Sequence, residues 1–114
     1  MSESWEVREG STATITCQLL AGNTEIDLTD AVRVTLHMKD KQSKTYRYNS
    51  EDDPGVIAMS SPLTDGKVTF VPPSGTFINN RTPYLGYWLV YTTETDYYAV
   101  PENSEFVFNV RAIF

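Results

Sequence analysis

The sequence predicts an all-β fold, an antiparallel β-sandwich of about eight short strands. Apolar residues recur at every second position along most of the chain, which is the period of a strand with one buried face. Glycine, proline, asparagine and aspartate stand between the alternating runs, where turns are needed. The length of 114 residues suits one domain with its own core and is short for two. We therefore expect a single domain over residues 1–114.

The alternating runs place the strands in order along the chain. We expect strands at Trp5–Arg8, Thr12–Leu19, Val32–Lys39, Thr45–Tyr48, Val56–Ser60, Lys67–Val71, Leu85–Thr93, Tyr97–Val100 and Phe106–Ala112. The run Leu85–Thr93 is apolar at consecutive positions, which predicts a central strand covered on both faces. Asp65-Gly66 predicts a turn before the next strand. The interval Pro72–Pro83 does not alternate, and we expect a connection there with one helical turn around Phe77–Asn79.

Charge and composition exclude several classes of partner. The net charge of −6 argues against nucleic-acid binding, because such proteins displace counterions from phosphate with a basic surface. The longest apolar run, Tyr87–Tyr91, is far shorter than a membrane span. Residues 1–6 lack the basic head and apolar run of a signal peptide, so we expect assembly in a cytoplasm.

The residues that carry chemistry are few. His37 is the single histidine, so we expect no histidine-pair metal site, no Ser-His-Asp arrangement and no Cys-His dyad with a spare orienting histidine. It falls on the polar face of its strand, where an exposed or interface position is expected. The single cysteine, Cys17, falls on an apolar face and is expected to pack in the core. The acidic run Glu51–Asp53 lacks the alternating spacing of calcium loops. We expect no enzyme activity, no catalytic or metal site and no cofactor.

Basic residues are concentrated in one predicted hairpin. One interpretation is that its lysines guard an edge strand against pairing with other chains. The other is that this hairpin contacts an acidic patch on a neighbouring copy, because an acidic body with one basic tip suits head-to-tail assembly. The candidate contact residues, with the long loop included, are Lys39, Lys41, Lys44, Tyr46, Arg47, Tyr48, Phe77, Ile78 and Arg81.

Aromatic residues are numerous for a small sandwich, with seven Tyr, five Phe and two Trp. Exposed tyrosine and tryptophan are common at protein interfaces and on sugar-binding platforms. An alternative function is therefore a carbohydrate-binding or adhesin-type module that stacks sugars on Tyr46, Tyr48, Trp88 or Tyr98.

Three segments in order carry a resemblance to a known family. They are the Asp27-Leu28-Thr29 corner that leads into a long strand, the segment Asp65–Phe70, and Gly86–Thr93 followed by a short acidic turn and Tyr97–Pro101. Together they resemble the immunoglobulin-like N-terminal domain of tailed-phage baseplate upper proteins. The resemblance implies an immunoglobulin-like sandwich in a tail or baseplate component of the virion, homo-oligomeric in the particle and docked to other phage virion proteins. A head decoration or head-tail connector protein is an alternative with the same domain.

Overall fold

The computed structural model describes residues 4–21, 23–101 and 105–113. The expectation about a signal peptide rests partly on residues 1–3, which lie outside the described residues. The described chain is nearly all β, and it confirms the predicted sandwich. The molecule measures 43 × 29 × 24 Å along its principal axes.

Eleven strands and two short 3-10 turns make up the described chain. They are β1 (Ser4–Arg8), β2 (Ile15–Gln18), β3 (Leu20–Ala21), β4 (Thr24–Glu25), β5 (Arg33–Lys39), β6 (Thr45–Asn49), β7 (Ile57–Met59), η1 (Leu63–Asp65), β8 (Lys67–Phe70), η2 (Asn79–Arg81), β9 (Tyr84–Tyr91), β10 (Tyr97–Val100) and β11 (Phe106–Arg111). Each predicted strand therefore has a counterpart, although the one expected over Thr12–Leu19 is regular only at Ile15–Gln18. The expected helical turn also forms later in the loop, at Asn79–Arg81.

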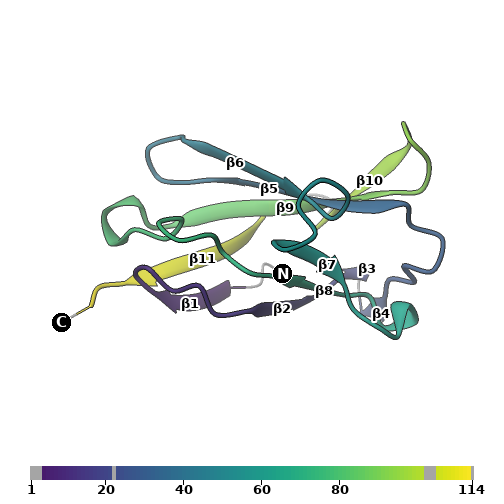
Figure 1. Ribbon diagram of the computed structural model, residues 1–114, viewed down its shortest axis with the longest axis horizontal. Helices are drawn as coiled ribbons and strands as arrows, with labels where there is room; N and C mark the ends of the chain where they lie inside the picture. The colour runs from purple at the N-terminus through teal and green to yellow at the C-terminus, as the bar shows by residue number, and fades with distance from the viewer. Residues whose placement is uncertain (1–3, 22, 102–104, 114) are drawn as a thin grey trace.

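The larger sheet has the order β1-β11-β9-β5-β6 and is built around the long strand β9 (Figure 1). β10 and β11 pair in succession with the same edge of β9, β10 with its C-terminal half and β11 with its first residues. β1 pairs with β11 in parallel, and β5 pairs antiparallel with β9 along seven residue pairs. β6 is an edge strand, as the interpretation of the lysine-rich hairpin required.

The smaller sheet has the order β2-β8-β7 and forms the second layer of the sandwich (Figure 1). Its strands correspond to B, E and D of an immunoglobulin sandwich, and β6-β5-β9-β11 correspond to C′, C, F and G. β3 and β4 form a separate two-stranded ribbon at one end.

The core lies between the two sheets and is rich in aromatic side chains. The largest buried side chains are Trp88, Tyr84, Phe70, Phe77, Phe106 and Phe108. The Phe77 and Phe108 rings meet with centroids 5.2 Å apart. Cys17 is buried among these residues, as predicted. A Cβ atom on Gly86 would lie 2.7 Å from the Phe106 ring, so glycine is needed for this close approach.

The Asp27-Leu28-Thr29 corner closes one end of the sandwich. Leu28 is fully buried, and the Asp27 carboxylate accepts a hydrogen bond from the backbone N–H of Thr29 at 2.9 Å. The Thr29 hydroxyl donates to the same carboxylate. These bonds from Thr29 lower the pKa of Asp27. The corner therefore has the role that its residue types predict.

Candidate interaction surfaces

A buried carboxylate organises the turn between β5 and β6. Asp40 Oδ1 accepts hydrogen bonds from the backbone N–H groups of Gln42 at 2.8 Å and Lys44 at 3.0 Å. Its Oδ2 accepts from the Tyr46 hydroxyl at 2.9 Å and from Arg81 Nη1 at 3.0 Å. Because the donors converge on one side chain, the turn and the η2 loop are held together.

The charge state of Asp40 follows from these contacts. Burial favours the neutral form, but the hydrogen bonds from Arg81, the Lys44 backbone, Tyr46 and the Gln42 backbone outweigh it and lower the pKa of Asp40. Burial and the bond to Asp40 raise the pKa of Tyr46, whose phenol therefore stays protonated. Arg81 is thus paired with an acid of its own chain, and this reduces the charge that it offers to a partner.

The turn presents exposed lysines above this buried anchor. Lys39, Lys41 and Lys44 are exposed, and Arg47 is exposed on β6 opposite His37. We call the segment Lys39–Arg47 the basic hairpin. Five of the predicted contact residues lie in this segment: Lys39, Lys41, Lys44, Tyr46 and Arg47. Arg81 joins them through Asp40 and through the bond from the Lys41 N–H to the Arg81 carbonyl, 2.9 Å.

The loop before β9 is fastened from inside, which corrects one predicted contact residue. Phe77 is only 1% exposed and belongs to the core, so it is not available to a partner. Ile78 is half-buried, and its N–H donates to the Tyr84 hydroxyl at 3.0 Å. That hydroxyl donates in turn to the Thr76 carbonyl at 2.7 Å. This is the tyrosine corner of immunoglobulin-like sandwiches, in which a tyrosine early in strand F bonds the backbone upstream.

The predicted sugar-stacking platform does not assemble. Tyr46 and Tyr48 alternate with Arg47 and are half-buried, with their rings against Tyr84 and Phe70 of the core. Trp88 is 1% exposed. Of the four residues proposed for stacking, only Tyr98 is exposed. The four side chains therefore do not form a common surface on which a sugar could stack.

The opposite side of the larger sheet is a surface that the sequence did not predict. Leu85, Tyr87, Leu89 and Tyr91 alternate along β9 with core residues, so they share the face away from the smaller sheet, which we call the outer face. Tyr87 is 37% exposed and Leu85 and Tyr91 are half-buried, whereas Leu89 is buried, so the outer side of β9 is covered only in part and not fully as expected. His37, Lys39, Arg47, Leu85, Tyr87 and Glu105 line a groove of about 590 Å³ on this face.

His37 occupies the centre of the outer face. Its ring stacks on that of Tyr87, with centroids 5.3 Å apart and planes 3° from parallel. Burial, and then the positive charge of Arg47, lower the pKa of His37, so the ring is neutral at neutral pH. Its Nε2 atom is buried and has no hydrogen-bond partner in the described parts of the chain.

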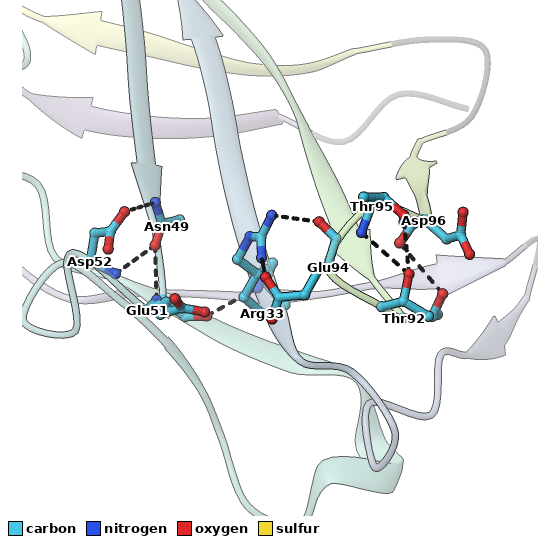
Figure 2. Close-up of polar contacts among 11 residues, drawn as sticks. Arg33, Asn49, Glu51, Asp52, Thr92, Glu94, Thr95 and Asp96 are labelled. Carbon is cyan, nitrogen blue, oxygen red and sulfur yellow. Dashed lines mark hydrogen bonds and ion pairs between the residues drawn. The ribbon is translucent and has the colours of Figure 1, made fainter.

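The other end of the larger sheet is acidic, and polar contacts join its side chains and turns (Figure 2). Arg33 Nη1 lies 3.5 Å from Glu94 Oε2 in the turn between β9 and β10. The Asn49 side chain accepts hydrogen bonds from the N–H groups of Glu51 and Asp52 and donates to the Asp52 carboxylate at 3.0 Å. The Glu51–Asp53 run therefore forms a turn, as solvated loop charge would. In residues 4–21, 23–101 and 105–113, no group of three or more His, Cys, Asp or Glu side chains could hold a metal ion.

Basic and acidic residues are distributed unequally between the two ends of the molecule. We call the end of the molecule that carries the β5–β6 turn the hairpin end, and the end that carries the β9–β10 turn the corner end (Figure 1). By their places in the strands and loops, the basic residues at or toward the hairpin end are Arg8, Lys39, Lys41, Lys44, Arg47, Arg81 and Arg111, and the acids Glu6, Glu9 and Asp40 lie there too, with Glu6 paired with Arg111 and Asp40 with Arg81. The acidic residues at the corner end are Glu25, Asp27, Asp30, Glu51, Asp52, Asp53, Asp65, Glu94 and Asp96, and the basic residues Arg33 and Lys67 lie among them, so positive charge prevails at the first end and negative charge at the second.

Comparison with models of protein families and with curated proteins finds no match to this chain. None of the helical turns in the described ranges is long and apolar enough to cross a membrane.

Proposed function

We propose that this chain is a structural protein of a tailed-phage virion, a tail or baseplate component that acts by docking to itself and to other virion proteins. The observation that carries the proposal is the combination of the outer face with the basic hairpin beside it. A sheet face that exposes a large aromatic side chain and a groove, with cations at one rim, has the composition of a protein-binding surface. The resemblance of three segments to baseplate upper proteins supports the setting.

We also propose that the chain acts without catalysis. Its one histidine and one cysteine lie in different layers, because His37 faces outward from the larger sheet and Cys17 is buried in β2 of the smaller sheet. Nucleophilic catalysis needs a base within hydrogen-bond reach of the nucleophile, and this pair does not provide that geometry.

The location can be tested directly on particles of the phage that encodes the chain. Antibodies against the purified protein, with gold labels, should decorate the tail or baseplate in electron micrographs, and mass spectrometry should find the protein in gradient-purified particles. Label confined to the head would instead support the decoration or connector alternative. Absence from purified particles would contradict the virion role altogether.

A further inference from the structure

The outer face of the larger sheet is large enough to be an interface. β9 is eight residues long, or about 26 Å at roughly 3.3 Å per residue. The path β1-β11-β9-β5-β6 is five strands wide, or about 24 Å at roughly 4.8 Å per strand. The flat area is therefore about 600 Å², and protruding side chains add to it. Stable interfaces bury about 600–1,000 Å² per partner, so the flat area of this face lies at the lower end of that range.

The chemistry of the face also suits burial. Along the outer side of β9, Tyr87 is 37% exposed, Leu85 and Tyr91 are half-buried and Leu89 is buried, and Tyr97 continues this apolar line on β10, where it pairs with Tyr91. Tyr97 is 57% exposed. At the centre the histidine ring is neutral, and Arg47 shares its groove with the opposite charge of Glu105. The middle of the face can therefore lose water at low electrostatic cost.

The charge distribution selects the orientation of a partner. β6 leads from Lys44, directly before its first residue, to Glu51, two positions after its last, and the Lys44 ammonium lies 5.3 Å from the centroid of the Tyr46 ring at this edge of the sheet. If a second copy lies face to face with its strands reversed, Lys44 of each copy comes opposite Glu51 of the other. With strands in the same direction, the basic ends would instead meet and repel each other. An end-to-end contact would satisfy the charges but leave the exposed rings of Tyr87 and Tyr97 in water.

We propose that a second copy of this chain covers the outer face, related by a two-fold axis that lies between the faces and runs across the strands. Such a contact is isologous: both copies use the same patch, and assembly closes at two. The inference rests on the proposed assembly role, because it names one partner in that assembly. The two fail differently: a monomer found in particles would overturn the self-pairing and leave the docking to other virion proteins, and a dimer absent from particles would overturn the virion role alone.

The first test is the mass of the full chain in solution. Sedimentation over a concentration series should show twice the 12.9 kDa chain mass, with no larger species. A chain that stays monomeric up to about 1 mM, where an association of only about 4 kcal/mol would be visible, overturns the proposal. Species that grow beyond two copies would show an end-to-end contact and also overturn it. Another virion protein bound to this face of a monomer would do the same.

The second test places the contact on the outer face. Tyr87→Asp should weaken the dimer at least tenfold, because it puts a charge at the centre of the interface. Tyr98→Asp is the matched control: Tyr98 is 40% exposed but pairs with Val90, so its side chain belongs to the other side of β10. Circular dichroism confirms that both variants are folded. If the two variants dimerise with the same affinity, the outer face is not the dimer contact.

The third test fixes the orientation by exchanging charges. Lys44→Glu and Glu51→Lys change exposed residues, and each should weaken its own homodimer several-fold at low salt. In a mixture of the two variants, both opposed pairs become attractive again, so mixed dimers should form close to the wild-type affinity. A mixture that dimerises no better than either variant alone would refute the antiparallel arrangement.

Discussion

Removing one hydroxyl, with Tyr84→Phe, should destabilise the fold strongly. The Tyr84 side chain is fully buried, and its hydroxyl joins the Thr76 carbonyl at 2.7 Å and the Ile78 N–H at 3.0 Å. The variant keeps the ring and the packing but leaves both backbone groups without this partner. At about 1–1.5 kcal/mol for each, the free energy of unfolding should fall by about 2–3 kcal/mol. For 114 residues, at about 4 °C per kcal/mol, this lowers Tm by about 8–12 °C.

Urea unfolding followed by tryptophan fluorescence measures this loss. The midpoint should move to lower urea with an unchanged slope, because the surface exposed on unfolding stays the same. Tyr97→Phe is the control: it removes the same hydroxyl from a side chain that is 57% exposed, and it should change stability by less than about 0.5 kcal/mol. If the two variants unfold at the same urea concentration, the tyrosine corner does not fasten the loop.

Three further outcomes follow from the structure. Asp40→Asn should lower stability at pH 7 by about 2 kcal/mol through loss of the charged bond to Arg81. The pKa of Asp40 is lowered in the folded state, so its contribution to stability is present above pH 3.8 and is lost as the pH falls further. The free energies of unfolding of wild type and variant should therefore converge in acid, and a difference that stays constant with pH would contradict this. Gly86→Ala should cost about 1–3 kcal/mol, since its Cβ would meet an aromatic ring of β11, whereas Gly55→Ala, with open space around it, should be nearly neutral by thermal melting. The Cys17 thiol should react with Ellman's reagent at least a hundredfold faster in urea than in the native state, and equal rates would show that it is not buried.

Alternation along the chain predicted the sandwich and most strand positions because the side-chain period of a strand is visible locally. It failed at β9, where consecutive residues are apolar. Periodicity does not say which of two apolar faces meets the second sheet, so Tyr87 was expected to be buried and is instead on the outer face. The structure places His37 directly opposite Tyr87 in the register. Alternation had placed His37 on the polar face of its own strand, but nothing local pairs that face with Tyr87.

The remaining misses concern long-range partners. Asp40 stands in a run of charged residues and would ordinarily be solvated, but Arg81, 41 positions away, makes its burial possible. Phe77 was placed in an exposed loop because the interval has no period, yet a single large ring can enter the core from an irregular segment. Nothing local to Tyr84 announces the two backbone groups that its hydroxyl binds.

The parallel pairing of β1 with β11 has a mechanical consequence. The five paired positions run from Ser4 with Val107 to Arg8 with Arg111. Tension that pulls the start of β1 away from the end of β11 acts along the strands, so the hydrogen bonds between them are loaded together, in shear. A hairpin pulled open from its ends would release the same bonds one by one. The pairing of β1 with β11 is therefore the part of the molecule best oriented to resist stretching.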